Sequence, residues 1–502
     1  MAANEEQVTL QRNAISAISS MVIGVASTAP GFAIAVTLGF VVATAGMGPH
    51  APAVMLVGFI PMFCIALAYR AMNRADPDCG TSFAWTTRAF GPTIGWVSGW
   101  AILMAEIVVN ANQAEFAGVY GFQLFGLNAL ANNLVAVTVL GVLFIAVLTW
   151  ICYLGIQPSA RTQRLLLGLE LFTLVLFSVV ALIKVYTGNV AHSALPTIGW
   201  FNPFAVGFTP LLLGVLLAVF LYWGWDAGVS VNEETRDADT APGSAAVGST
   251  ILLVGIVVLV TVAAQAFAGT HYLSLNDADV FGGSLGHSVL GPGLDKLLIL
   301  ALLSSSTAAT QTTILPAARS ALSMARHGAI PHKFAEIHHR HRTPAFATFV
   351  VGALSIVWFV FIVQVSTNVL ADCITGTGFL ICFYYGFTGF SSAWYYRREL
   401  RRSLRSFLTL GFAPALGGVL LLGVFIKSML VYSNPANDVS KPLLGLGVPV
   451  WIGVGLLVLG FILALALRIP YPEFFRQRPL VAGAEPAGAG PSRVIEPLGV
   501  EA

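Results

Sequence analysis

Long apolar segments, separated by short polar connections, follow one another along almost the whole chain. Each is long enough for a helix that crosses the roughly 30 Å hydrocarbon core of a bilayer. The twelve segments cover residues 14–45, 50–72, 94–120, 132–153, 164–187, 209–231, 245–268, 294–324, 345–365, 370–396, 409–432 and 445–467. This pattern predicts an all-α membrane protein with 12 transmembrane helices.

The composition supports a membrane protein and excludes several classes of soluble protein. Of the 502 residues, 57% are hydrophobic and 10% are charged, whereas soluble domains carry about 25% charged residues. A net charge of +2 is too small to imply nucleic acid. No P-loop motif occurs, and the five cysteines have no metal-ligand spacing. We therefore expect no enzyme activity, no cofactor, no metal site and no nucleic-acid partner.

The basic residues are divided unequally between the two sets of loops that twelve helices define. Lys184, Lys296, Lys427 and Lys441 fall in one set, and the other 21 of the 25 basic residues fall in the second. Basic residues concentrate in cytoplasmic loops. We therefore expect a multi-pass protein of the cytoplasmic (inner) membrane with both termini in the cytoplasm.

Outside the apolar segments, the chain divides into a short N-terminal segment, 1–13, and a C-terminal tail, 469–502. The tail is rich in Pro, Gly and Ala, so we expect an unordered cytoplasmic extension. Residues 14–468 form the membrane domain, and its connection 269–293 is predicted to carry a short surface helix.

The first apolar segment is too long for one straight helix. At 1.5 Å per residue its 32 or so residues would span about 48 Å, and Pro30 and Gly31 lie near its middle. Proline removes a backbone donor and glycine relaxes the chain, which predicts a break. Because lipid does not tolerate unpaired backbone groups, the break should face a polar cavity. A packing kink is the alternative.

The sixth segment contains a matching feature, in which Gly224 and Gly228 flank the ionisable Asp226. An acid at membrane depth is a functional candidate, although it can also cap a broken helix. Breaks in the first and sixth of twelve helices are typical of two inverted five-helix halves with the substrate between them. The positive end of a half-helix suits a carboxylate, and free carbonyls with Asp226 suit an ammonium group. An amino acid has both.

Three motifs resemble the amino acid, polyamine and organocation (APC) superfamily of transporters over residues 14–432. They are Ala325–Pro331 with Phe334, Gly224–Asp226 followed by Glu233–Glu234, and Pro77–Gly80 followed by Trp85. Three positions depart from the family's pattern: Cys79 stands where glycine is usual, His327 stands where an acid is usual, and Glu170 stands where some proton-driven members have a lysine.

The resemblance implies a 5+5 inverted repeat with broken helices 1 and 6. Its halves would cover about 14–187 and 209–398, with helices 11 and 12 (409–467) outside it. It also implies a substrate site on the two breaks. The carboxylate would be held by Ser27, Thr28, Ala29 and Gly31, the amine side would be lined by Trp223, Gly224, Trp225 and Asp226, and Phe220 would form an aromatic lid.

Further polar residues lie inside the apolar segments. Glu170 occupies the position where some proton-driven members have a lysine, and a carboxyl group in an apolar surround is a usable proton carrier. A structural hydrogen bond is the alternative. Glu106 and Asn110 lie on one stripe of the third segment, which indicates either a cavity or helix packing.

The sequence therefore predicts a secondary active transporter, or permease, of amino acids that works by alternating access. Proton symport is expected, and sodium coupling is the less favoured alternative. A cationic amino acid or polyamine transporter or antiporter is the second reading, and an amino acid sensor or uncoupled channel belongs to another class. The expected partners are a small-molecule substrate and the lipid bilayer.

Overall fold

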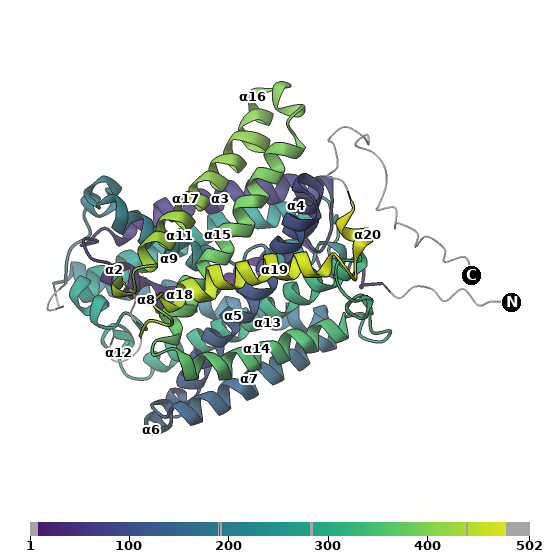
Figure 1. The fold of residues 1–502 in the computed structure, drawn as a ribbon. Helices are drawn as coiled ribbons and strands as arrows, with labels where there is room; N and C mark the ends of the chain where they lie inside the picture. Colours follow the sequence, from purple (N-terminus) through teal and green to yellow (C-terminus); the bar gives the residue numbers. More distant parts are fainter. Residues whose placement is uncertain (1–8, 189, 191–192, 282–284, 438–439, 478–502) are drawn as a thin grey trace, which may run out of the picture.

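The computed structural model describes residues 9–188, 190, 193–281, 285–437 and 440–477 (Figure 1). In that part of the chain, 12 helical spans are long and apolar enough to cross a membrane, which confirms the predicted number. The spans are Ala17–Ala43 (α1 and α2), Ala51–Ala75 (α3), Pro92–Leu124 (α5), Leu134–Leu154 (α7), Arg161–Tyr186 (within α8, Ile156–Tyr186), Phe208–Ser230 (α9 and α10), Ala241–Leu275 (α11), Leu294–Arg326 (α13), Ala345–Val365 (α14), Val369–Tyr395 (α15), Leu404–Tyr432 (α16 and α17) and Val448–Leu467 (α18 and α19).

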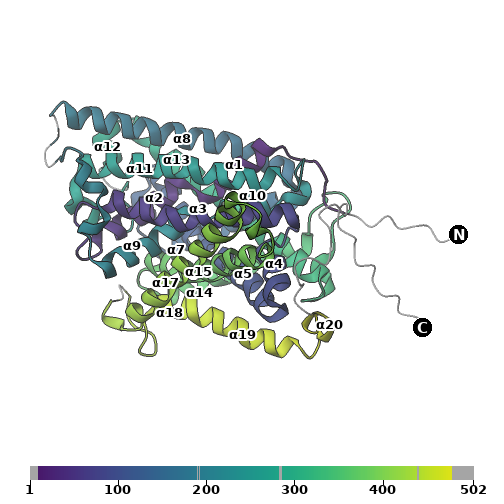
Figure 2. The same cartoon turned by 90° about the horizontal axis from the view of Figure 1, so that it is seen from above.

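The helices differ in how much apolar surface they bury. Nearly every residue of α2 and most residues of α15 are buried. The peripheral helices α7, α8 and α19 instead expose large apolar side chains such as Leu143, Phe172 and Ile462. Figure 2 shows α8 and α19 at opposite edges of the bundle, with α2 and α15 between them. Apolar surface on the outer helices suits lipid, so the chain is a multi-pass membrane protein.

Short helices mark the two ends of the bundle. Helices α4 (Ser82–Phe90) and α20 (Pro472–Phe475) lie at one end, and α6 (Asn128–Ala131) and α12 (Leu285–Leu290) lie at the other (Figure 1). The end with α4 also carries the connection that follows α13, because Phe83 of α4 packs against His327. We call this end, which contains α4, α20 and the connection that follows α13, the basic end. Helix α12 falls in the connection where the sequence predicts a short helix.

The segment before α1 is tied to the residues that follow the sixth span. The Ile15 N–H donates to the Glu234 carbonyl at 3.1 Å, and the Arg236 N–H donates to the Ile15 carbonyl at 2.9 Å. These bonds form a short parallel bridge between Ile15 and Thr235. Leu10, further upstream, is buried beside Cys79. The start of the chain is therefore packed against the basic end.

The C-terminal tail begins with the short helix α20. Phe474 in this helix is buried and stacks on Phe83 with ring centroids 5.9 Å apart. The segment predicted to be unordered therefore starts with residues that pack on the bundle. Residues 478–502 of the predicted tail lie outside the described residues.

Candidate functional site

The first span is broken at the predicted place. Helix α1 (Ala17–Thr28) ends before Ala29, which has φ 48° and ψ 62°, and α2 (Pro30–Ala43) begins with Pro30. A left-handed conformation is unfavourable for a residue with a Cβ, so the surrounding packing must hold it. Pro30 suits the first position of a helix, because no intrahelical donor is needed there. The break puts the N-terminus of a half-helix inside the bundle.

The free amides at the start of α2 have partners on other helices. The Gly31 N–H donates to Glu170 Oε1 at 2.7 Å, and the Phe32 N–H donates to Ser305 Oγ at 3.1 Å. The Ser305 hydroxyl donates to the same Glu170 oxygen at 2.7 Å. Glu170 is fully buried, and its Oε2 has no hydrogen-bond partner. The chain therefore places one of its own carboxylates at the positive end of this half-helix.

The sixth span is also broken where the sequence predicts. Helix α9 (Phe208–Tyr222) ends before Trp223, whose backbone is extended, and Gly224 has φ 114°. A single turn, α10 (Ala227–Ser230), follows. Only glycine adopts such a φ without strain. The four residues between α9 and α10 include the predicted Asp226.

The two breaks touch each other. A Cβ on Gly224 would lie 2.8 Å from the carbonyl carbon and oxygen of Ser27, and 2.9 Å from the Thr28 nitrogen. A Cβ on Gly24 would lie 2.8 Å from the Trp225 carbonyl oxygen. The backbones approach this closely because both positions lack a side chain. The structure thus places Ser27 and Thr28 of the first break against Gly224 of the second.

The hydroxyl groups predicted to hold a carboxylate already have backbone partners. Ser27 Oγ donates to the Thr312 carbonyl at 3.3 Å, and Thr28 Oγ1 donates to the Gly24 carbonyl at 3.2 Å. The Ala29 N–H donates to the Ala26 carbonyl at 3.2 Å. A substrate carboxylate at this break would have to compete with these bonds and with Glu170.

Asp226 is buried in a group of aromatic residues. Its Oδ2 accepts bonds from the Tyr69 and Tyr384 hydroxyls, both at 3.4 Å, and its Oδ1 has no hydrogen-bond partner. The Trp225 ring lies 5.0 Å from the Tyr69 ring and 5.2 Å from the Tyr385 ring. Aromatic faces and a carboxylate attract cations. The three tyrosines were missed by the sequence reading, and the adjacent Tyr384 and Tyr385 inside an apolar span were the available signal.

The predicted lid residue belongs to the same group. Phe220 is buried, and its ring centroid lies 6.5 Å from that of Trp223. The Trp223 Nε1 donates to the Tyr384 hydroxyl. Trp223 therefore connects the break to α15.

The polar stripe of α5 is divided between two roles. Asn110 donates to Ser355 at 2.9 Å and accepts from Thr313 at 2.6 Å, so it joins α5 to α13 and α14. Glu106 is buried, and its Oε2 has no hydrogen-bond partner. Asn112, which the sequence reading missed, is fully buried with neither amide atom hydrogen-bonded. Asn112 does not lie on the stripe formed by Glu106 and Asn110, so the spacing of polar residues did not indicate it.

Two ion pairs lie near the basic end, and one of them is buried. Arg319 Nη2 lies 2.6 Å from Glu234 Oε2, and each side chain is 1% exposed. Burial raises the pKa of Glu234, and the neighbouring Arg319 guanidinium opposes that rise. Arg326 and Glu233 form a second pair at 2.8 Å. These pairs join α13 to the residues after α10.

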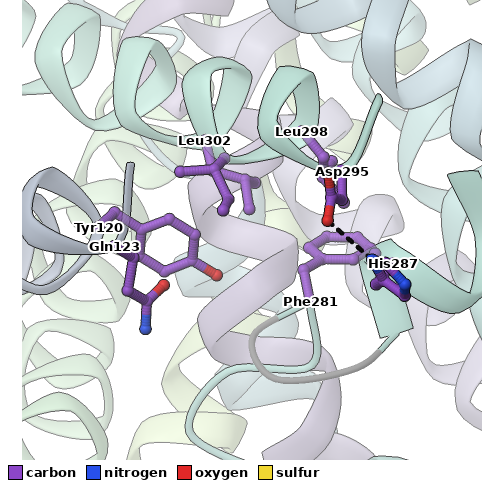
Figure 3. A pocket seen from close by; sticks show the side chains of 9 residues that line it. Tyr120, Gln123, Phe281, His287, Asp295, Leu298 and Leu302 are labelled. Carbon is purple, nitrogen blue, oxygen red and sulfur yellow. Dashed lines mark hydrogen bonds and ion pairs between the residues drawn. The ribbon is translucent and has the colours of Figure 1, made fainter. Parts of the chain in front are cut away.

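Two hollows lie away from the breaks. The first, of about 60 Å³, is shown in Figure 3, where Tyr120 and Leu302 lie on one side and Phe281 lies on the other, next to the pair formed by His287 Nδ1 and Asp295 Oδ2 at 2.9 Å. A volume of that size holds only a few water molecules. The second, larger hollow is lined by residues such as Trp200 and His271. Neither contains a predicted site residue.

Two broken helices in contact inside a bundle of twelve spans are features of a secondary transporter. The chain belongs to the amino acid permease family, because the family model described as "Amino acid permease" matches residues 11–464. This match confirms the resemblance to the APC superfamily, and the chain is a membrane transporter of small molecules.

Named relatives are similar over much of their length. The low-affinity putrescine importer PlaP of Escherichia coli (strain K12) is 21% identical over 437 residues, which cover 85% of this chain and 88% of the relative. The vacuolar cationic amino acid transporter 4 of Arabidopsis thaliana is 26% identical over 383 residues, which cover 71% of this chain and 60% of the relative. The branched-chain amino acid permease BcaP of Lactococcus lactis subsp. cremoris (strain MG1363) is 23% identical over 320 residues, which cover 61% of this chain and 66% of the relative.

Proposed function

We propose that this chain is a proton-coupled secondary transporter that carries amino acids across the cytoplasmic membrane by alternating access. The observation that carries the proposal is the contact between the two breaks, with the Glu170 carboxylate bonded to one of them. The proposal includes a 5+5 inverted repeat, with α17 and α19 outside it, and both termini in the cytoplasm. The family match and the unequal distribution of basic residues support these parts.

Glu170 is proposed to be the residue that carries the proton. Its Oε1 accepts hydrogen bonds from Gly31 and Ser305, and both bonds are strongest when the carboxyl group is ionised. Protonation therefore weakens the attachment of α8 to the half-helix α2. A substrate carboxylate can then take the place of Glu170 at the Gly31 amide, which couples binding to protonation.

The amine side of the substrate is proposed to bind near Asp226 and its aromatic neighbours. Asp226 Oδ1 has no partner, and the rings of Trp225 and Tyr385 lie beside each other. An ammonium group there would gain a charge-assisted hydrogen bond and cation–π contacts. Phe220 and Trp223 would cover the bound substrate.

A cationic amino acid or a polyamine is the second candidate substrate. Glu106 and Asp226 are both buried, and each has one oxygen without a partner. Among the described residues, Arg319 is the one fully buried basic side chain, and it is paired with Glu234. An additional ammonium group on the substrate would compensate this pair of acids. The names of the putrescine importer and the cationic amino acid transporter agree with this candidate.

Uptake by purified protein in proteoliposomes tests the proposed function. We expect labelled amino acid to accumulate against its gradient when an inward pH gradient is imposed, and to stop accumulating when the gradient is collapsed by a protonophore. If accumulation depends on a sodium gradient instead, sodium and not the proton is the coupling ion. Equilibration without accumulation under either gradient would favour an uncoupled channel, and ligand binding without uptake would favour a sensor.

The substrate class can be assigned beforehand by thermal unfolding. A ligand that binds only the folded chain raises the melting temperature. A panel of neutral amino acids, cationic amino acids and polyamines should therefore give a shift for one group alone. That group is then the substrate for the uptake experiment.

A further inference from the structure

Three side chains of types that ligate metal ions converge at the basic end, and a histidine contacts one of them. One ligand atom from each of Asp78, Cys79 and Glu233 lies within 4.8 Å of the other two. The Nε2 atom of His327 lies 3.6 Å from Oδ2 of Asp78. We call these four residues the Cys–His cluster.

The hydrogen bonds of His327 show which ring nitrogen is free to act as a ligand. Its Nδ1 lies 2.9 Å from the Ser323 carbonyl oxygen, which can only accept, so Nδ1 carries the proton. In the neutral imidazole the lone pair is then on Nε2, which faces the Asp78 carboxylate. An imidazole nitrogen and a carboxylate oxygen 3.6 Å apart can hold either a proton or a metal ion between them. A histidine that ligates a metal commonly donates its other N–H to a backbone carbonyl in this way.

The carboxylates of the cluster are held in place by hydrogen bonds, one of which runs from the Cys79 N–H to Glu233 Oε1 at 3.3 Å. Asp78 Oδ1 accepts from the Gly80 N–H at 2.7 Å and from the Ser323 hydroxyl at 2.6 Å. Glu233 Oε2 accepts from Arg326 at 2.8 Å. These bonds orient the ligand atoms before any ion binds. Arg326 also offsets part of the negative charge of the four ligands.

The donor set indicates the class of ion. One thiolate, one imidazole and two carboxylate oxygens combine soft and hard donors, as zinc sites do, whereas calcium and magnesium prefer oxygen alone. Cys79 is fully buried, and its thiol donates to the Arg319 carbonyl oxygen at 3.5 Å. Zinc binding would displace the thiol proton, and the divalent ion would offset the charge of the buried thiolate.

We propose that Asp78, Cys79, Glu233 and His327 bind a zinc ion at the basic end of the bundle. The ion would join three elements: the connection between α3 and α4, the 3-10 turn Asn232–Glu234 after α10, and the end of α13. If the proposed alternating access is correct, these elements must separate to open a path at this end. The bound ion therefore holds that end closed and slows transport.

Zinc binding is measured on the full chain, purified in detergent and freed of metal with a chelator. Isothermal titration with a zinc salt alone should show one ion per chain. Cys79→Ser and His327→Gln should each weaken binding by roughly tenfold or more. Cys64→Ser and His338→Gln are matched controls that remove a buried cysteine and a histidine elsewhere, and both should bind as the original chain does.

X-ray absorption at the zinc edge tests the ligand set directly. The spectrum should contain one zinc–sulfur distance of about 2.3 Å together with nitrogen or oxygen ligands, and the sulfur contribution should be missing in Cys79→Ser. If Cys79→Ser does not fold, as judged by gel filtration, Cys79→Gly supplies the family's usual residue for the same comparison.

Several outcomes would overturn the site. They are the absence of saturable zinc binding, unchanged binding in Cys79→Ser, a spectrum without sulfur, and loss of binding in His338→Gln. The first of these would leave an ion pair between His327 and Asp78 as the explanation of the 3.6 Å contact.

The effect on transport is measured separately. Zinc added on the side of the basic end should slow uptake by the original chain but not by Cys79→Ser. Equal slowing in both would contradict the proposal that the bound ion holds this end closed. A chain that accumulates no substrate under any gradient would contradict the proposed function. The zinc titration would still report on the site in that case.

Discussion

The position of Glu170 makes a single carboxyl group responsible for two bonds at the first break. Glu170→Gln keeps the shape of the side chain, and its amide oxygen can still accept from Gly31, but it can no longer exchange a proton. We expect uptake by this variant to lose its dependence on pH while substrate binding remains measurable. Initial uptake rates in proteoliposomes over a series of pH values, with thermal shift for binding, test this.

The matched control is Glu115→Gln, which replaces another acid on a membrane-spanning helix. Its pH dependence should match that of the original chain. Unchanged pH dependence in Glu170→Gln would remove Glu170 as the proton carrier and leave it as a structural partner of the break.

Asp226 has one free oxygen and a ring of aromatic neighbours, so its charge is available to a substrate. Asp226→Asn should weaken binding of cationic substrates by about tenfold or more, in the range of a charged hydrogen bond, and should affect neutral amino acids less. Competition of unlabelled amino acids against labelled uptake measures both. Tyr384→Phe keeps the carboxylate and serves as the control. Equal losses for the two substrate groups would contradict a role in recognising charge.

At the residue scale, the sequence identified the acids but not their partners. Asp226 and Glu170 stood out because ionisable residues are rare in apolar segments. Their contacts come from residues far away in the chain: Tyr384 is 158 positions from Asp226, and Gly31 is 139 from Glu170. No local pattern specifies such distances. For the same reason the roles predicted for Ser27 and Thr28 did not anticipate that backbone carbonyls already accept from their hydroxyls.

At the scale of elements, the contact between the two breaks depends on a glycine. Gly224→Ala would place a Cβ 2.8 Å from the Ser27 carbonyl group and would force alanine into φ 114°. We expect a loss of stability of about 1–3 kcal/mol and a large loss of uptake, because the breaks would be pushed apart. Thermal unfolding and uptake assays measure the two effects.

Gly255→Ala in α11 is the control for this substitution, since no atom lies within 4 Å of the place that its new methyl group would take. It should leave both measurements unchanged. Full uptake by Gly224→Ala would show that transport does not need this close approach.

The ion pair between α13 and the residues after α10 is a second test at this scale. Arg319→Met leaves Glu234 buried without a partner, which typically costs about 3–5 kcal/mol. Adding Glu234→Gln removes the isolated charge and should recover much of that loss. A double-mutant cycle by thermal unfolding in detergent measures the coupling. Additive losses would mean that the two residues stabilise the protein independently.

The existence of both breaks could be predicted, because proline and glycine act on the backbone within a few residues. Pro30 begins α2, and Gly224 lies in the gap before α10, as expected. The crossing of the two broken segments could not be predicted, since it depends on Gly24 and Gly224 meeting backbone from the other segment. Packing of that kind is decided by the three-dimensional approach of the helices.

For the whole molecule, the distribution of basic residues predicts which end faces the cytoplasm. Arg340→Cys introduces a thiol at an exposed position of the basic end, and Asn128→Cys introduces one at the opposite end. The five native cysteines are buried and should react slowly. In intact cells, a membrane-impermeant maleimide should label Asn128→Cys but should label Arg340→Cys only after permeabilisation. The reverse result would invert the proposed orientation.

The number of spans was the most predictable property of the molecule, because hydrophobic length alone determines it. The packing of Phe474 on Phe83 was not predictable. The surrounding tail is rich in Pro, Gly and Ala, and a single aromatic residue is a weak signal in such a composition. Its docking depends on an apolar surface that only the folded bundle provides.

The hydrogen bonds of Ile15 with Glu234 and Arg236 join the residue before α1 to the residues after α10, and Gly228 of α10 closely approaches the Ser20 carbonyl of α1. We expect two elements joined in this manner to move as one rigid unit when the protein changes conformation. A covalent staple between them should therefore leave turnover intact, whereas a staple from either one to α13 should arrest the cycle. Cross-links of this kind would show which helices move during transport and which remain in place.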